Sequence, residues 1–136
     1  TEAATHMMEA SGTTAKDYKW AIFHQPNTKF PQRVASQLGF SMEQIEPGLL
    51  VGVIGNTYAG AAMIGLTATL DIAQPGDRIL CVSFGSGAGS DAFDITVTDA
   101  APLRAGLAMK TQDYVKRRSE IDYATYVRYR GKLQMK

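Results

Sequence analysis

The sequence predicts an α/β fold in which helices and strands form layers around one core. Two short apolar runs, residues 19–23 and 78–84, have the length and composition of buried strands. The chain between them carries apolar residues at helical spacing, and residues 92–97 alternate as a strand does. With 136 residues, 45% of them hydrophobic, the chain suffices for one packed domain and is too short for two ordinary ones.

The first elements place a histidine at the end of a strand. Residues 2–10 have the pattern of a helix, which Gly12 ends. Residues 19–23 form the first strand, and His24 follows at its carboxyl end. Ligands of open α/β sheets bind outside the carboxyl ends of the strands, so we expect His24 to lie near a binding site.

A helix and a short helical turn follow this strand. Residues 29–38 carry apolar side chains on one face, Phe30 among them, and Gly39 closes the helix. Ser41 and Gln44 have the spacing of a capping box, which opens one further turn.

The middle of the chain is predicted as a loop, a central helix and a hairpin. Residues 52–56 are glycine-rich and predict a loop, whereas residues 60–72 predict a helix whose small residues allow nearly complete burial. A Pro-Gly-Asp turn follows at residues 75–77, and residues 85–89 join the last two strands as a hairpin-like turn. Three strands are few for a stable sheet. We therefore expect the chain to be half of a larger unit and to expose apolar surface when it is alone.

Composition excludes several classes of protein. No stretch reaches the roughly 20 apolar residues that a membrane span requires, and no basic and then apolar leader suggests export. The single cysteine, Cys81, allows neither an internal disulfide nor a thiolate-rich metal site. We therefore expect a cytoplasmic protein without a metal site and without a membrane partner.

The charge is divided unevenly along the chain. Residues 1–100 carry five Lys or Arg against ten Asp or Glu, whereas residues 101–136 carry nine against three. The predicted organisation is a half-domain over residues 1–100 and a basic tail over residues 101–136 that packs on it, with Tyr123, Tyr126 and Tyr129 as a packing stripe. The tail is either a solvated helix face or a contact for a protein partner. Nucleic acid is not expected, because no recognised binding motif accompanies the charge.

Two polar motifs lie beside turns that glycine permits. They are Phe23-His24-Gln25-Pro26-Asn27 and Gly55-Asn56-Thr57-Tyr58-Ala59-Gly60. An imidazole and a carboxamide donate hydrogen bonds without a negative charge that would repel an enolate. Such donors, held ready in a dry site, stabilise a thioester enolate or a tetrahedral oxyanion. His24 and Asn56 therefore indicate an acyl-CoA site; the alternatives are a structural histidine and an asparagine in a left-handed turn.

Longer motifs resemble one known family. The stretches FHQPNTKFPQRVA, IGNTYAGAAMIGL and PGDRILCVSFGSGAGSDAFDI, with IDYATY and RYRGK in the tail, are similar to the carboxyl-terminal half of archaeal-type hydroxymethylglutaryl-CoA synthase. The resemblance covers nearly the whole chain. It implies the C-terminal half of a thiolase-like layered α-β-α fold, a mixed sheet with helices packed on it. More loosely, His-Gln-x-Asn and Gly-Asn-Thr resemble type III ketoacyl synthases of the same superfamily.

The resemblance implies a condensation of acetyl-CoA with acetoacetyl-CoA, in the mevalonate route to isoprenoids. In that family an amino-terminal cysteine is acetylated, a glutamate removes a methyl proton, the carbanion attacks the ketone, and water releases the product. Neither residue is present here. Cys81 lies in an apolar strand, away from a helix N-terminus that would stabilise a thiolate, and no glutamate falls in a matching motif. We expect the chain to be inactive alone, with CoA thioesters as substrates and no cofactor.

Three positions match the donors of that family's site. His24 matches the histidine that hydrogen-bonds the acetoacetyl group, and Asn56 matches the asparagine that assists it. Ser86, flanked by Gly85 and Gly87, falls where the superfamily offers a backbone N–H to the thioester oxygen. For this last segment, a plain glycine turn is the alternative.

Two cations match positions that face the phosphates of CoA. They are Lys29 and Arg33, which are one helical turn apart and therefore lie on one face. Ordinary solvated helix charges are the alternative.

The resemblance also implies partners. These are the N-terminal half of the same enzyme, a second copy in a homodimer or larger assembly, an acetoacetyl-CoA thiolase and a small zinc-ribbon/OB-fold protein. Two other functions stay open: a non-catalytic half that docks other proteins, and a type III ketoacyl synthase-like enzyme that uses acyl carrier protein. Tyr58 disfavours the second, because those synthases carry a small hydroxyl residue there.

Overall fold

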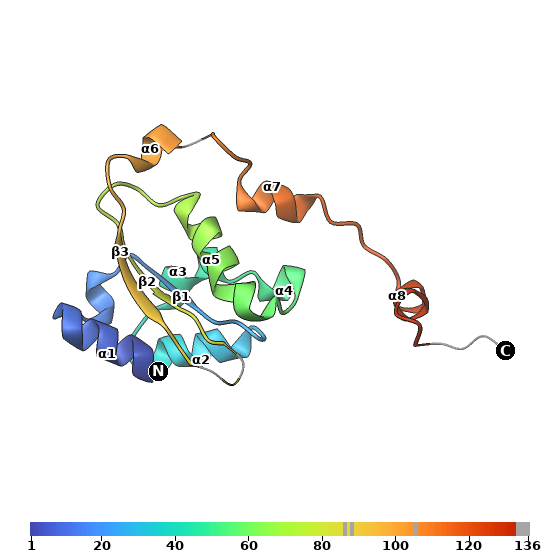
Figure 1. Ribbon diagram of the computed structural model, residues 1–136, viewed down its shortest axis with the longest axis horizontal. Coiled ribbons are helices and arrows are strands. Elements are labelled where there is room, and N and C mark those ends of the chain that lie inside the picture. The colour runs from blue at the N-terminus through green and yellow to red at the C-terminus, as the bar shows by residue number, and fades with distance from the viewer. Residues whose placement is uncertain (86, 88, 105, 133–136) are drawn as a thin grey trace.

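Three strands form the sheet at the centre of the fold (Figure 1). The computed structural model describes residues 1–85, 87, 89–104 and 106–132. Strands β1 (Trp20–Phe23) and β2 (Arg78–Val82) pair in parallel, and β3 (Ala92–Thr96) pairs antiparallel with β2. The order β1-β2-β3 confirms the predicted mixed sheet, including the antiparallel pairing of the last two strands.

Strands β1 and β2 are buried on both faces, which gives the fold two cores. Side chains alternate along a strand. Phe23 and Leu80 therefore face one cluster of buried residues, whereas Ile22 and Cys81 face the other. Helices cover both sides, as the continuous apolar runs of these strands require. The predicted α/β layered class is confirmed.

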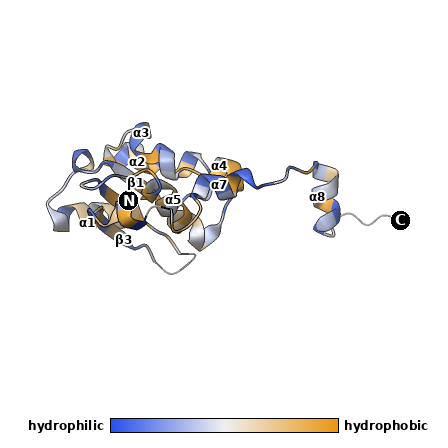
Figure 2. Cartoon of the chain, turned by 90° about the horizontal axis from the view of Figure 1, so that it is seen from above, coloured by the Kyte–Doolittle hydropathy of each residue, from blue (hydrophilic) through white to orange (hydrophobic). Residues whose placement is uncertain are grey.

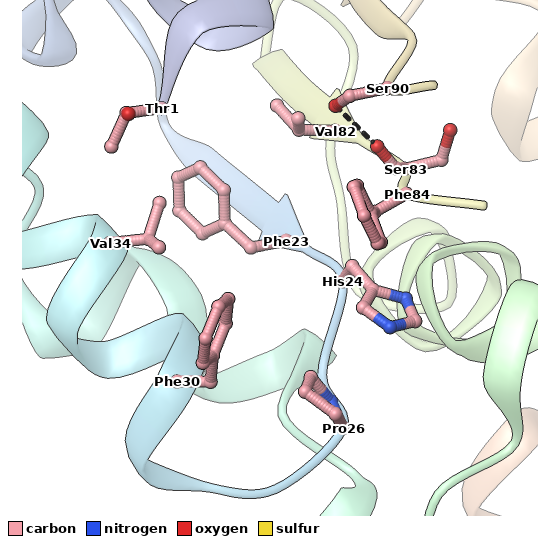
Figure 3. A pocket seen from close by; sticks show the side chains of 10 residues that line it. All are labelled: Thr1, Phe23, His24, Pro26, Phe30, Val34, Val82, Ser83, Phe84 and Ser90. Carbon is pink, nitrogen blue, oxygen red and sulfur yellow. Dashed lines mark hydrogen bonds between the residues drawn. The ribbon is translucent and has the colours of Figure 1, made fainter. Parts of the chain in front are cut away.

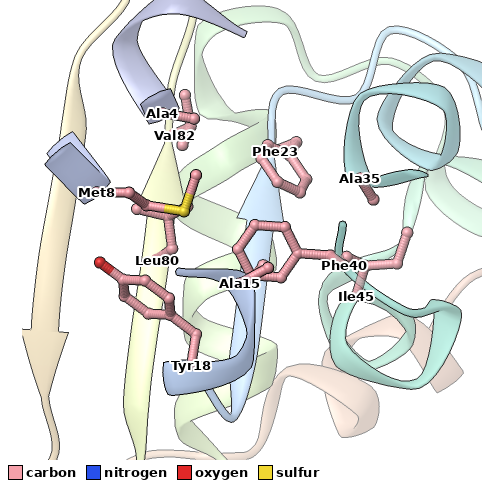
Figure 4. Close-up of a cluster of buried hydrophobic side chains, with 11 residues drawn as sticks. Ala4, Met8, Ala15, Tyr18, Phe23, Ala35, Phe40, Ile45, Leu80 and Val82 are labelled. Carbon is pink, nitrogen blue, oxygen red and sulfur yellow. The ribbon is translucent and has the colours of Figure 1, made fainter. Parts of the chain in front are cut away.

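Short helices cover the first face of the sheet. They are α1 (Glu2–Ser11), the 3₁₀ turn η1 (Ala15–Asp17), α2 (Lys29–Leu38) and α3 (Met42–Ile45). Figure 4 shows side chains from all of them meeting around Phe40. Gly12 and Gly39 end α1 and α2 with left-handed backbone, φ 62° and 86°, which glycine adopts without strain. The predicted capping box of Ser41 and Gln44 is present at the start of α3.

Short elements lead to the helix that covers the second face. They are the 3₁₀ turns η2 (Glu46–Gly48) and η3 (Tyr58–Gly60), and the helices α4 (Val51–Ile54) and α5 (Ala61–Leu70). The prediction of a loop over residues 52–56 is wrong in its first part, because α4 reaches Ile54. The side chain of Gln25 accepts hydrogen bonds from the N–H groups of Leu50 and Val51 and so satisfies the start of this single turn.

Helix α5 is buried on one side only. Ala62, Gly65 and Thr69 are buried, whereas Met63 and Leu70 are about half exposed. The prediction of nearly complete burial is therefore wrong for this chain. Further apolar side chains are exposed elsewhere in the chain: Val53, Ile72, Leu103, Leu107 and Met109. They confirm the expectation of exposed apolar surface.

The tail begins against the body and then leaves it. It contains α6 (Ala101–Arg104), α7 (Thr111–Lys116) and α8 (Tyr123–Tyr129). Thr111 ties α7 to α5, because its N–H donates to Asp71 Oδ2 at 2.6 Å and its hydroxyl contacts that of Thr67 at 3.1 Å. Figures 1 and 2 both show α8 apart from the body.

The tyrosines of the tail do not form the predicted packing stripe. Tyr123, Tyr126 and Tyr129 are all exposed, because α8 has no layer of the body against it. The division of the chain at residue 100 stays a prediction. None of the described helices has the length and apolar composition that a membrane-spanning segment requires.

An ion pair between Arg78 and Asp94 connects β2 to β3. Arg78 Nε donates to Asp94 Oδ1 at 2.8 Å, and the guanidinium also donates to Oδ2. Such two-point bonding is stronger than a single contact. The hydrogen bonds from Arg78, with smaller contributions from Ser11 and Tyr18, hold the pKa of the Asp94 carboxyl below its usual value.

Replacing this carboxylate should weaken the fold in a pH-dependent way. Asp94→Asn should lower the free energy of unfolding by about 1–2 kcal/mol at pH 7, because Arg78 loses its charged partner. The wild-type contribution is present above the unfolded pKa of about 3.9 and is lost as the pH falls through the lower folded value. Urea unfolding between pH 2 and pH 7 measures both effects. An equally steep loss of stability below about pH 4 in the variant would contradict this assignment.

Candidate active site

His24 leaves the sheet at the carboxyl end of β1. Its backbone N–H donates to Val82 O at 3.0 Å, so the pairing of β1 with β2 continues to this residue. The side chain is half-buried and lies beside Phe84, with ring centroids 5.8 Å apart. The strand ladder thus fixes the place from which the imidazole projects.

A cavity of about 260 Å³ lies on one side of His24. Figure 3 shows its wall, to which β1, β2, α2 and the segments after both strands contribute. Most of the lining is apolar: Phe23, Pro26, Phe30, Val34, Val82 and Phe84. Thr1, Ser83 and Ser90 supply the other contacts. An apolar cavity with one imidazole at its edge suits a ligand with a short polar group on an aliphatic stem.

A second cavity of about 210 Å³ lies on another side of the same histidine. Tyr58 and Ala59 line it together with Phe84 and Gly87. The two cavities share His24 and Phe84. The imidazole therefore lies between the first, apolar cavity and the loop that follows Asn56.

One nitrogen of His24 has no hydrogen-bond partner within the described ranges. Nδ1 is buried, and no described residue offers it a hydrogen bond. A buried polar atom without a partner is destabilising, and such atoms are rare outside functional sites. This unsatisfied atom marks His24 as a candidate functional residue.

The carboxamide of Asn56 is oriented by the backbone. Its Oδ1 accepts a hydrogen bond from the N–H of Tyr58 at 2.7 Å. A backbone N–H can only donate, so the amide oxygen must face it and the NH₂ group is left exposed as a donor. The left-handed residues here are Gly55 and Tyr58, with φ 78° and 54°, and Asn56 is not among them. The alternative of Asn56 as a left-handed turn residue is therefore wrong.

The loop of Asn56 approaches His24, but through its neighbours. Tyr58 and Ala59 line the second cavity, whereas Asn56 is among the described lining residues of neither cavity. Tyr58 is exposed and has positive φ, which is a strained conformation for a bulky residue. The hydrogen bond from its N–H to Asn56 holds that conformation.

The glycine turn after β2 reaches the same region. Gly85 N donates to Gly89 O at 2.9 Å, and Gly87, with φ 76°, lines the second cavity. Ser86, which the resemblance assigns as an oxyanion donor, lies outside the described residues. The described part of the turn places a left-handed glycine beside His24 and Phe84.

Lys29 and Arg33 lie together at the start of α2. They line a shallow pocket of about 340 Å³ with Asn27, Thr28 and Phe30, and both side chains are exposed. No described acidic group forms an ion pair with either cation. Lys29, the first residue of α2, is repelled by the positive end of the helix dipole. An anionic ligand would therefore relieve an unfavourable arrangement.

Cys81 is not equipped as a nucleophile. It is a free, buried thiol in β2, and burial raises its pKa to about 11. The thiolate is the reactive form, so this side chain is inert near neutral pH. Within the described ranges, no group of three or more His, Cys, Asp or Glu side chains could hold a metal ion.

Sequence reasoning missed the aromatic walls of the first cavity. Phe30 was predicted on the apolar face of a helix, yet it is about half exposed and lines the cavity. Phe84 was predicted inside a strand, but β2 ends before it at Val82. The available signal was their position, each within a few residues of a polar motif.

Comparison with known proteins decides the family. Residues 8–95 match the family described as 3-oxoacyl-(acyl-carrier-protein) synthase III C terminal, which is more than half of the chain. The chain belongs to this family. Membership agrees with the layered fold and with the position of His24 at a strand end.

Two similar proteins of known name make the resemblance more specific. The hydroxymethylglutaryl-CoA synthase of Methanocella arvoryzae is 56% identical over 131 residues, which are 96% of this chain and 38% of that protein. The synthase of Thermococcus onnurineus is 59% identical over 133 residues, 98% of this chain and 38% of that protein. The chain thus spans little more than a third of these relatives. The predicted resemblance to archaeal-type hydroxymethylglutaryl-CoA synthase is confirmed.

A solved structure shows the same fold. PksG, an HMG-CoA synthase from Bacillus subtilis, superimposes with a TM-score of 0.73 at 18% identity. The match covers 91% of this chain and 35% of PksG. The prediction of half of a thiolase-like layered fold is confirmed.

The thiol of Cys81 should be unreactive in the folded chain. With a pKa of about 11, it stays protonated at pH 8, and its burial also excludes a bulky reagent. Iodoacetamide at pH 8 should leave the native protein unmodified and add one carbamidomethyl group in urea, as intact mass would show. Rapid modification of the native protein would contradict this description of the site.

Proposed function

We propose that this chain is the part of a hydroxymethylglutaryl-CoA synthase that receives acetoacetyl-CoA. The enzyme would convert acetyl-CoA, acetoacetyl-CoA and water to 3-hydroxy-3-methylglutaryl-CoA and CoA, in the mevalonate pathway. The observation that carries the proposal is the His24 imidazole at the end of β1, which lines two cavities and whose buried Nδ1 has no hydrogen-bond partner among the described residues. The names of the relatives point the same way.

The donors of this chain would act on the second substrate. In the reaction, an acetyl group is held as a thioester on a cysteine, a base removes its methyl proton, and the carbanion forms a bond to the ketone carbon of acetoacetyl-CoA. Negative charge then develops on the ketone oxygen. His24 donates to that oxygen, and the exposed NH₂ of Asn56 assists after the loop closes on the substrate. Water finally cleaves the thioester and restores the cysteine.

The glycine turn and the cations have separate roles in this proposal. The backbone N–H at Ser86, between Gly85 and Gly87, is the proposed donor to the oxygen of the cysteine-bound thioester. Lys29 and Arg33 bind the phosphates of CoA. Both side chains are exposed and have no acidic partner in the part of the chain that the structure describes, which supports this assignment.

A second polypeptide segment must supply the nucleophilic cysteine and the glutamate base. We use the term assembled enzyme for this chain in complex with the segment that its longer relatives carry in addition. The exposed apolar side of α5 supports a close partner of this kind, because such surface is costly in water. In this proposal the chain is inactive by itself, and the assembled enzyme forms a homodimer or larger cytoplasmic complex. An acetoacetyl-CoA thiolase and a small zinc-ribbon/OB-fold protein are its further predicted partners.

The choice of substrates tests the proposal directly. The assembled enzyme should release free CoA over repeated turnovers only when acetyl-CoA and acetoacetyl-CoA are both present, whereas acetyl-CoA alone should release about one equivalent per cysteine, from the acetylation step. Activity restricted to an acyl-carrier-protein substrate would instead assign a ketoacyl synthase. A stable assembly with neither activity would assign a docking half without catalysis.

Removing the imidazole should separate the two half-reactions. His24→Ala in the assembled enzyme should lower kcat of condensation about 100- to 1,000-fold, because one oxyanion donor is lost. Acetylation of the cysteine should continue, since His24 acts on the second substrate. Rapid-quench measurement with labelled acetyl-CoA resolves the two steps. Equal loss of both would point to misfolding or to another role for His24.

Neutralising the two cations should affect binding alone. The double variant Lys29→Gln and Arg33→Gln should raise KM for acetoacetyl-CoA about tenfold or more, because charge-assisted phosphate contacts are lost. Its kcat should stay near the wild-type value. Lys16→Gln, at an exposed lysine in η1, is a matched control that should change neither constant. Unchanged KM in the double variant would make both residues ordinary surface charges.

A further inference from the structure

Gln25 is a buried polar residue directly beside the proposed catalytic histidine. It is 3% exposed, and the only other buried polar side chain in the described part of the chain is Thr69. Its Oε1 accepts from Leu50 N and from Val51 N, each at 2.8 Å. Its Nε2 donates to Gly48 O at 2.7 Å and to Ala61 O at 3.3 Å. All four hydrogen-bonding positions of the carboxamide are therefore occupied.

These bonds join segments that are distant in sequence. Gly48 ends η2, Leu50 and Val51 open α4, and Ala61 opens α5. Asn56 lies in the segment between Val51 and Ala61, which is therefore held at both of its ends by one side chain. Gln25 is itself one peptide bond from His24. A single buried carboxamide thus connects the strand end that carries the imidazole with the loop that carries the amide.

The packing around Gln25 leaves room for this side chain and for little else. A Cβ at Gly65 would lie 3.1 Å from Gln25 Nε2 and 2.9 Å from both Gly48 O and the Ile22 side chain. Glycine inside α5 therefore permits the close approach of the helix to the carboxamide. Thr69 satisfies its own hydroxyl within the helix, by donating to Gly65 O at 2.9 Å, and so does not compete.

We propose that Gln25 is a positioning residue for the condensation, which fixes the Asn56 loop relative to the His24 imidazole. This inference rests on the proposed function. The two donors stand on separate loops, and neither makes a hydrogen bond to the other among the described residues. Their distance must therefore be set through the backbone. The carboxamide connects those backbones directly. Its oxygen accepts from α4, and its nitrogen donates to η2 and α5, so both ends contribute.

The test uses Gln25→Met in the assembled enzyme, which keeps the length of the side chain and removes its hydrogen bonds. We expect kcat of condensation to fall about 100-fold, because a displacement of about 1 Å in a donor has that effect. Acetylation of the cysteine should proceed at the wild-type rate. Hydrogen exchange should accelerate in residues 50–58. Gln25→Glu places a carboxylate oxygen against the carbonyls of Gly48 and Ala61, so exchange should accelerate at least as much as in Gln25→Met.

Gln44→Met is the matched control. Gln44 also bonds backbone from a partly buried position, since it donates to Ala15 O at 2.9 Å and to Tyr18 O at 2.7 Å. It lies near the amino end of β1, however, away from His24. This variant should lose stability and keep the condensation kcat. If both glutamine variants lower condensation equally, the effect is a general loss of stability and the proposal is overturned.

A double variant checks the route of the effect. If Gln25 acts through the Asn56 loop, Gln25→Met and Asn56→Ala together should lower kcat no more than the larger single effect. Multiplying effects would overturn that route, and unchanged condensation in Gln25→Met would overturn the proposal as a whole. If the wild-type assembled enzyme condenses no acetoacetyl-CoA, the proposed function fails. Exchange in residues 50–58 then still decides whether Gln25 holds this loop.

Discussion

The parallel pairing of β1 with β2 is the interaction on which the site depends. Both strands are buried on both faces, so a shift of one residue would move apolar side chains into the wrong core. The register is therefore strongly fixed, and it ends with the bond from His24 N to Val82 O. Phe84 leaves the neighbouring strand at the same edge. The place of the imidazole is thus decided by core packing rather than by the loop that follows it.

The polar side chains of the candidate site donate hydrogen bonds or carry positive charge. His24 and the exposed amide of Asn56 can donate hydrogen bonds, and Lys29 and Arg33 are cations without an acidic partner in the described residues. The one thiol, Cys81, is kept neutral by burial. Such a surface suits negative charge that arrives with a ligand or develops during a reaction. Cys81 therefore does not serve as a nucleophile at this site.

Local signals in the sequence predicted most of the elements, and long-range contacts explain the failures. The helix ends at Gly12 and Gly39 follow from backbone freedom, which is a property of the residue itself. Helix α4 was missed because its start is satisfied by Gln25, 25 residues away from Leu50, and no local pattern contains that bond. The apolar run before His24 predicted its place at the end of a strand, whereas its role in a reaction stays a prediction. Phe30 escaped notice as part of the cavity, because apolar spacing does not distinguish a core face from a cavity wall.

The connection between β1 and β2 also has a consequence for the order of folding. These two strands are neighbours in the sheet, yet the chain between them includes every helix from α2 to α5. Pairing between distant segments loses loop-closure entropy before the stabilising contacts form. This entropy loss slows folding. We therefore expect α1 and α2 to acquire structure early and the pairing of β1 with β2 to form last. A nascent chain would expose its apolar strands during that interval, and chaperone binding should be strongest then.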